Sequence, residues 1–213
     1  MLAAAFVLAS QLLAAAAAAL PQAREELALL AVPPPGFEIT GFTSVGSGCP
    51  NPSTVQWIDD DKKGLSTIFS HMAAEIGPEV PASSNFKFCS VNLTASVPDG
   101  YAFGIINIKG SGHRAVGWET SAARRISYQW FDSPTSAHGG NDWYNTNSGP
   151  FDTLTEFGAI TLFSACGDRA ATVNVTETIK VALFNPWDIV KDPKPEGSLI
   201  LDSSYYEFAF KTC

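Results

Sequence analysis

From residue 36 onward, short runs of alternating apolar and polar residues follow one another, separated by clusters of turn-forming residues. One run places Val173, Val175, Ile179, Val181 and Leu183 on one face and Asn174, Thr176, Thr178 and Lys180 on the other. Side chains of a strand alternate between the two faces of its sheet, so a period of two is typical of strands with one buried face. We therefore expect antiparallel strands over most of the chain.

The segments expected to form strands share this alternation and are bounded by turn residues. They are 37–45, 54–58, 65–72, 86–97, 101–109, 114–120, 125–131, 152–164, 171–183 and 198–210. Gly110-Ser111-Gly112 is interpreted as a tight connection, residues 132–150 as a long surface loop, and 71–76 as a short helical turn. About ten strands in one unit predict an all-β, single-domain antiparallel β-sandwich with Greek-key or jelly-roll-like links.

The amino-terminal residues differ from the rest of the chain. No charge precedes Arg24, and an apolar run ends in alanines, with Ala17 and Ala19 placed as signal peptidase requires. Alanine contributes little to membrane insertion, so the run falls short of a membrane span. We expect a signal peptide over residues 1–19 that is cleaved near Ala19, a flexible leader over 20–35, one domain over 36–213, and secretion from the cell.

The chain contains four cysteines, Cys49, Cys89, Cys166 and Cys213. An even number in a secreted chain favours disulfides over free thiols, and four cysteines allow three pairings. A zinc site is disfavoured because no Cys-x-x-Cys pair occurs and the spacing is wide. We expect two bridges, one of which would tie down the carboxyl end at Cys213.

Charge excludes several classes of partner. The chain has 21 acidic and 13 basic residues and a formal net charge of −8, with the basic residues scattered along its length. Nucleic-acid binding and attachment to anionic membranes both require clustered basic residues. We therefore expect neither a nucleic-acid nor a membrane partner, and no pattern in the sequence indicates an oligomeric state.

The sequence contains no strong signature of catalysis. His71, His113 and His138 are isolated, no Gly-x-Ser-x-Gly elbow occurs, and bridged cysteines cannot act as nucleophiles. We predict no catalytic residues, no metal ligands and no cofactor. A glycosidase needs two facing carboxylates, and Asp142, Asp152, Glu156 and Glu119 are the candidates for that alternative.

Two kinds of surface site are predicted. Asn92 and Asn174 each begin an Asn-x-Thr sequon on the polar face of an expected strand, where an N-linked glycan would reach solvent. Aromatic and polar residues flank the expected loop, and they form a candidate binding loop for glycan. They are Trp130, Asp142, Trp143 and Tyr144. In the alternative, Trp130 ends a core strand, and Trp143 and Tyr144 pack beneath the loop.

Several motifs resemble one known family. They are Gly46-Ser47-Gly48-Cys49-Pro50, Val97-Pro98-Asp99-Gly100-Tyr101 shortly after Cys89, Gly149-Pro150, Phe163-Ser164-Ala165-Cys166-Gly167, and Asp202-Ser203 before the terminal cysteine. Together they resemble DUF4360, a family of secreted, mostly fungal proteins of unknown function, over residues 36–213. The resemblance implies the sequential pairing Cys49–Cys89 and Cys166–Cys213. It carries over no catalytic residue, and Ala165 stands where the family commonly has proline.

These observations favour a non-enzymatic secreted protein that acts at a cell wall or host interface by binding glycan or an extracellular protein. The alternative is a secreted carbohydrate-active hydrolase that uses paired carboxylates. A purely structural component of a wall or matrix is the third hypothesis.

Overall fold

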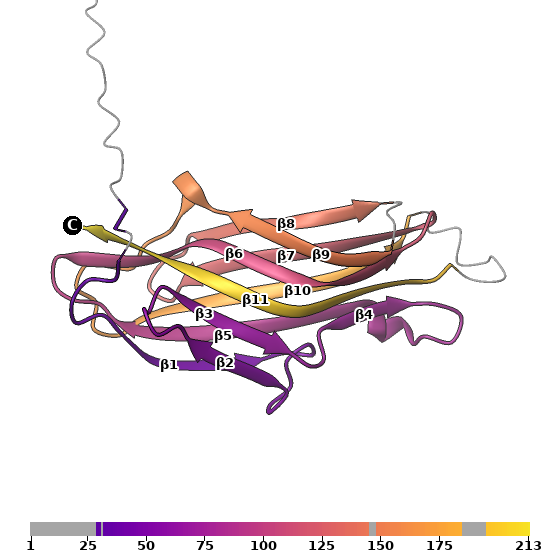
Figure 1. Cartoon of the computed structure of the whole chain (residues 1–213), viewed down its shortest axis with the longest axis horizontal. Helices are drawn as coiled ribbons and strands as arrows, with labels where there is room; N and C mark the ends of the chain where they lie inside the picture. Colours follow the sequence, from indigo (N-terminus) through magenta and orange to yellow (C-terminus); the bar gives the residue numbers. More distant parts are fainter. Residues whose placement is uncertain (1–28, 31, 145–147, 185–194) are drawn as a thin grey trace, which may run out of the picture.

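A computed structural model describes residues 29–30, 32–144, 148–184 and 195–213. The chain folds into two antiparallel β-sheets that pack face to face (Figure 1), and the expected all-β sandwich is confirmed. The predicted signal peptide lies outside the described residues, as does most of the predicted leader. Within the described ranges, no helix is both long enough and apolar enough to span a membrane.

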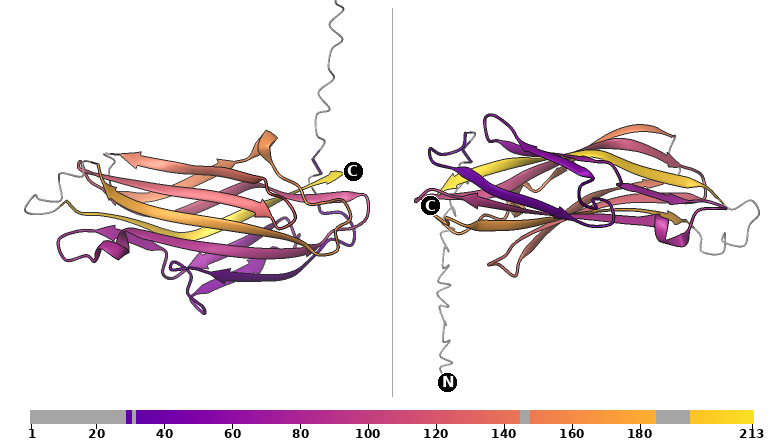
Figure 2. Two further views of the ribbon diagram at one scale, coloured as in Figure 1. Left: turned by 180° about the vertical axis from the view of Figure 1, so that it is seen from behind. Right: turned by 90° about the horizontal axis from the view of Figure 1, so that it is seen from below.

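The first sheet has five strands. Their order across the sheet is β1 (Glu38–Val45), β5 (Phe86–Ser96), β10 (Ala171–Leu183), β7 (Thr120–Trp130) and β8 (Ser136–Tyr144). The central strand β10 pairs with β5 on one side and with β7 on the other, so segments distant in the chain are neighbours in the sheet. Figure 2 shows this sheet from behind.

The second sheet has six strands, five in line and one shorter strand beside them. The order is β2 (Thr54–Ile58), β3 (Gly64–Phe69), β11 (Gly197–Thr212), β6 (Tyr101–Val116) and β9 (Gly149–Glu156), and β4 (Ala73–Ile76) also pairs with β11. Two short 3₁₀ helices, Ala82–Asn85 and Gly158–Ile160, lie in connections. The carboxyl terminus lies at one end of the sandwich and β4 towards the other (Figure 1).

The core lies between the sheets and is formed by the inward phase of the alternation. Val173, Val175, Ile179 and Val181 are buried on β10, as the period of two predicts. Near the end that holds the carboxyl terminus, Phe103 is surrounded by other aromatic rings. Its neighbours are Phe37, Trp130, Phe208 and Phe210, with ring centroids 5.0 to 5.8 Å away. Burying each such side chain contributes about 1.5–3 kcal/mol.

One ion pair interrupts this apolar interior. The Nε and Nη2 of Arg124 on β7 donate hydrogen bonds to Oε2 of Glu177 on β10 at 2.9 and 2.6 Å. Tyr206 donates to the other carboxylate oxygen at 2.7 Å, and Thr153 and Ser204 accept from the guanidinium. The pair is fully enclosed, and its polar atoms are satisfied within the protein.

Five expectations about local structure are wrong. The expected strand 114–120 is interrupted at residues 117–119, which join β6 to β7, and the expected strand 152–164 ends at Glu156, before a 3₁₀ helix. Strand β6 runs without a break through Gly110-Ser111-Gly112, because this stretch continues the ladder with β11. Residues 132–150 are not a long loop, since they contain β8 and the start of β9. Residues 73–76 form β4 rather than a helical turn, because they pair with β11.

Both disulfides have the sequential pairing. Cys49–Cys89 joins the segment after β1 to β5, and Cys166–Cys213 fixes the carboxyl-terminal residue, so both predicted bridges are confirmed. Within the predicted leader, Leu30 makes an isolated bridge with Phe210 and packs against the core. The boundary at residue 36 stays a prediction.

Candidate functional site

The structure separates the four residues of the predicted binding loop. Trp130 is only 1% exposed, packs edge-on against Phe103 and donates from its indole nitrogen to the Leu162 carbonyl. It is therefore a core residue, as the alternative interpretation had it. Trp143 on β8 is half-buried with its ring centroid 5.0 Å from that of Phe151. These two indoles are committed to packing.

The other two residues of that set reach the surface. Asp142 pairs with Arg125 at 2.6 Å on the outer face of the five-stranded sheet. Tyr144 is exposed at the end of β8, and its ring makes an edge contact with the exposed Phe184 at 6.2 Å between centroids. A binding role for the four residues stays a prediction, and Tyr144 lies nearest to the site described next.

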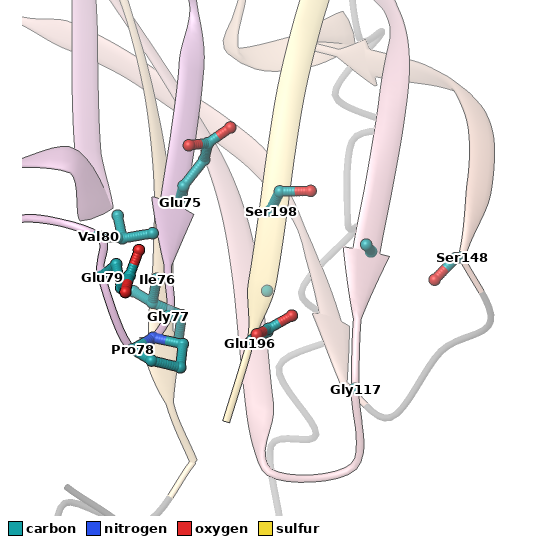
Figure 3. Close-up of a pocket in the computed structure, with 12 residues that line it drawn as sticks. Glu75, Ile76, Gly77, Pro78, Glu79, Val80, Gly117, Ser148, Glu196 and Ser198 are labelled. Atoms are coloured by element: carbon teal, nitrogen blue, oxygen red, sulfur yellow. The ribbon is translucent and has the colours of Figure 1, made fainter. Parts of the chain in front are cut away.

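A pocket of about 650 Å³ opens at the end of the sandwich away from the carboxyl terminus. It is formed where β4, β11 and β6 lie side by side, because Ser198 pairs with both Glu75 and Ala115. Three glutamates line it: Glu75 on β4, Glu79 just after β4, and Glu196 just before β11. Figure 3 shows these carboxylates around the start of β11, with Ser148 at the opposite side.

The pocket is acidic. No lysine, arginine or histidine is found among the described residues that line it, and Ser148 and Ser198 add hydroxyl groups. Carboxylates at neutral pH act as hydrogen-bond acceptors only, whereas hydroxyls can donate or accept. The pocket thus suits a ligand that is rich in hydrogen-bond donors, and its carboxylates oppose an anionic ligand.

A cluster of exposed aromatic rings lies at the same end of the molecule. Strands β6 and β7 are joined by a tight turn in which the Thr120 amide donates to the carbonyl of Gly117, a residue of the pocket wall. Trp118 follows Gly117 in this turn and is 81% exposed. The Phe184 amide donates to the Glu119 carbonyl in the same turn. We call Trp118, Tyr144 and Phe184 the aromatic tip.

The aromatic tip gathers three exposed rings: Trp118 is 81% exposed, Phe184 64% and Tyr144 52%. Single exposed apolar residues are common on soluble proteins, whereas clustered ones mark ligand or partner surfaces. The turn that carries Trp118 is closed by the hydrogen bond between Thr120 and Gly117, and the indole ring is open to solvent. The tip and the acidic pocket together form our candidate functional site.

A second hollow, of about 440 Å³, lies on the outer face of the six-stranded sheet. Lys109, Asp152, Ser203 and Tyr205 are among its lining residues. The Tyr205 hydroxyl donates to Asp59 at 2.7 Å, and desolvation together with this carboxylate raises the pKa of the phenol. Lys109 lies over the Tyr205 ring and pairs with Glu207. The polar groups here mostly satisfy one another, which makes this face a weaker candidate.

The carboxylates that the sequence offered for hydrolysis do not converge. Asp142 lies on the outer face of one sheet, Asp152 and Glu156 lie on β9 of the other, and Glu119 lies in the β6–β7 turn. The acids that do share a pocket were missed. Glu79 and Glu196 each follow a proline at a strand end, which signals a surface position, but only the pairing of β4 with β11 brings them together.

The fold and this surface define the class: a β-sandwich, stapled by two disulfides, with a candidate ligand site at one end. The chain matches the family model of DUF4360, a domain of unknown function, over residues 35–213. It therefore belongs to the DUF4360 family, and the resemblance seen in its motifs is confirmed.

One curated protein is similar to this chain. The chain is 24% identical over 149 residues to an "Uncharacterized secreted protein" of Arthroderma benhamiae, a match that covers 70% of this chain and 60% of that protein. The chain thus spans less than two thirds of the length of this relative.

Two solved structures match this chain distantly. TmCBM61 in complex with beta-1,4-galactotriose has a TM-score of 0.31 and 5% identity, with 80% of this chain and 90% of that chain covered. The enzymatically active domain of tailspike protein 4 from bacteriophage CBA120 has a TM-score of 0.27 and 9% identity, with 82% and 20% covered. At such TM-scores, neither match carries an argument about function.

Proposed function

We propose that this protein is secreted and binds glycan, without catalysis, through the aromatic tip and the acidic pocket. Secretion is supported by the two disulfides, which are typical of oxidising compartments, and by the secreted relative. The observation that carries the proposal is Trp118, an 81% exposed indole in a hydrogen-bonded turn beside a pocket of three carboxylates.

A glycan fits this chemistry better than the other ligands considered. A sugar ring presents an apolar C–H face that packs on an indole, and hydroxyl groups that donate to carboxylates. Pockets of about 300–1,000 Å³ are typical of small-ligand sites, and this one falls within that range. An anionic partner would be repelled by Glu75, Glu79 and Glu196, and by the net charge of −8.

The test is a glycan-array screen of the disulfide-intact protein, followed by calorimetry with the best ligand. We expect Trp118→Ala to weaken binding at least about fivefold, since aromatic stacking at binding sites contributes on the order of 1 kcal/mol or more. Phe131→Ala is the matched control: Phe131 is 69% exposed and follows β7 at the end opposite Trp118, roughly 35 Å away at 3.3 Å per residue.

Two results would overturn the proposal. One is a wild-type protein that binds no glycan on the array or at millimolar concentration in solution. The other is an equal loss of affinity in Trp118→Ala and Phe131→Ala, which would place the ligand away from the tip. Trp57→Ala tests the outer face of the six-stranded sheet, on which the second hollow also lies, in the same experiment.

The shared pocket of Glu75, Glu79 and Glu196 favours hydrolysis as the second candidate function. Glycoside hydrolysis needs one carboxyl as acid and another as nucleophile or base. Release of reducing ends from a bound polysaccharide, abolished by Glu→Gln at any of these positions, would identify a hydrolase. Binding that survives without product release would instead support the non-enzymatic proposal.

A further inference from the structure

The two predicted glycosylation sequons meet in the folded protein. Asn92 on β5 stands directly opposite Asn174 on β10, with both side chains half-buried on the outer face of the five-stranded sheet. The Nδ2 of Asn174 donates a hydrogen bond to Oδ1 of Asn92 at 2.7 Å. Opposed residues in an antiparallel pair have Cβ atoms about 4.5–5.5 Å apart, so the two sites occupy one small area of surface.

The two amides are used differently. Asn174 is engaged at both ends, because its Oδ1 also accepts from the Thr176 hydroxyl at 3.0 Å, and Thr176 is hydrogen-bonded to Ser90 at 2.6 Å. Asn92 contributes only its Oδ1: among the residues that the structure describes, its Nδ2 has no hydrogen-bond partner in the protein. Nδ2 is the atom that carries an N-linked glycan.

The positions of Asn92 and Asn174 in the sheet also favour Asn92 as the site of the glycan. Asn174 lies on the central strand β10, between Asn92 and Gln129. Asn92 lies one strand closer to the edge, where its other neighbour is the exposed Thr43 of β1. A glycan on Asn92 can therefore lean over the edge strand, whereas a glycan on Asn174 would have to cross occupied strands on either side.

The chemistry of attachment turns these differences into a choice. Nδ2 attacks the anomeric carbon of an oligosaccharide held on a lipid pyrophosphate; the C1–Nδ2 bond forms, the C1–O bond to the pyrophosphate breaks, and one amide proton is released. A glycan on Asn92 leaves its Oδ1 free to accept from Asn174. A glycan on Asn174 leaves a single N–H on the atom that donates to Asn92 and attaches a sugar ring to that same atom, so the amide pair is crowded.

We propose that the folded, secreted protein carries one N-glycan on this pair, and carries it on Asn92. The glycan is transferred to the nascent chain before the strands pair, so a second glycan is excluded during folding. With both asparagines modified, two sugar rings would stand side by side where β5 and β10 must pair. The inference is independent of the proposed glycan-binding function. Asn92 stands opposite Asn174, which is nine residues from Leu183, or about 30 Å along β10, so the point of attachment lies far from the aromatic tip.

The test is site mapping of protein secreted from a eukaryotic host. Enzymatic release of N-glycans in ¹⁸O-water converts each glycosylated asparagine to labelled aspartate, and intact mass counts the glycans per molecule. We expect one glycan, label at position 92 only, and doubly modified chains only in the unsecreted pool. Two glycans on secreted molecules, label at position 174, or an unmodified secreted protein would each overturn the proposal.

Variants of the sequon threonines separate glycosylation from loss of the asparagine pair, because both amides remain. Thr94→Val should remove the glycan from secreted protein, and Thr94→Ser, which keeps the sequon, should not. Thr176→Val should leave the glycan mass unchanged, although it removes the hydroxyl that donates to Asn174. A fall in mass by one glycan in secreted Thr176→Val would show that Asn174 is used and would refute the assignment to Asn92.

Discussion

Replacing Glu177 by glutamine leaves the Arg124 cation without its counter-charge in a place that water does not reach. The side chains of Arg124 and Glu177 are 0% and 1% exposed, and the closest contact between them is 2.6 Å. Glutamine keeps the volume and one acceptor oxygen for the guanidinium, and its NH₂ group can face the Tyr206 hydroxyl. The change therefore isolates the loss of charge from any loss of packing.

The expected cost is about 3–5 kcal/mol, which is the typical penalty for removing one partner of a buried ion pair. Domains of ordinary size have a free energy of unfolding of about 5–15 kcal/mol, so this loss is a large share of the total. Most of the penalty arises because a buried, uncompensated charge is unfavourable. It does not mean that the ion pair itself stabilises the fold by that amount.

Urea denaturation of the disulfide-intact protein measures this cost as a shift in midpoint at constant slope. Asp142→Asn is the matched control, since Asp142 pairs with Arg125, the neighbour of Arg124 that faces outward. That pair is 53% and 40% exposed, and its loss should cost less than about 1 kcal/mol. Equal losses in Glu177→Gln and Asp142→Asn, or a loss below about 1 kcal/mol in Glu177→Gln, would refute the reasoning.

Three further predictions concern the same fold. Replacing Cys166 and Cys213 by serine should cost about 4 kcal/mol in urea, because their bridge spans 47 residues, and a loss below about 1 kcal/mol would contradict the chain-entropy estimate. Burial raises the pKa of Tyr128 to about 12, so the folded state holds a proton that the unfolded state releases above about pH 10. The free energy of unfolding should therefore fall between pH 10 and 12, and a Tyr128→Phe variant with an equally steep fall would argue against this cause. Gly110→Ala would place a Cβ 2.6 Å from the Arg124 Cζ, and it should lower the free energy of unfolding by about 1–3 kcal/mol. In an Arg124→Met background the same change should lower it little, and additive losses from the two changes would count against this contact.

Most of the fold could be predicted from the alternation of apolar and polar side chains. Strands β2, β5 and β10 follow their expected ranges to within a residue, and β5 and β10 each have a buried face of valine, leucine or isoleucine. The order of strands within each sheet could not be predicted in this way. The order depends on which strands pair after the chain has crossed from one sheet to the other. The alternation of side chains shows which face of a strand is buried, but it does not show which strand lies next to it.

Glycine is where the interpretation of the sequence went wrong. Gly110 and Gly112 suggested a turn within what is β6, yet a Cβ at Gly110 would collide with the Arg124 guanidinium, and one at Gly112 would collide with the Ile200 carbonyl. Gly139 on β8 likewise lies against the Thr155 side chain. These glycines allow close approach inside a continuous sheet, and sequence alone does not separate that use from a turn.

The candidate site was predictable only in part. The sequence drew attention to Tyr144 as an exposed aromatic, and the structure places it at the aromatic tip. Trp118 falls within the expected strand 114–120, so nothing local indicates that it lies in a turn with its ring open to solvent. Glu75 and Glu196 are 121 residues apart in the chain, and only the β4–β11 pairing brings them to one pocket.

The buried ion pair could be expected from the positions of its two residues in the alternation of their strands. Glu177 occupies the apolar phase of β10 between Val175 and Ile179, and Arg124 occupies the apolar phase of β7. An unpaired charge in such a position is too costly to keep, so a charge in phase with the core implies an opposite charge on a facing or adjacent strand. Here the two strands are adjacent, and Glu177 stands opposite Ile126, two residues along β7 from Arg124. The charges that could act on a ligand are therefore those on the outward-facing positions of strands or in the segments between strands. Glu79 and Glu196 lie in such segments.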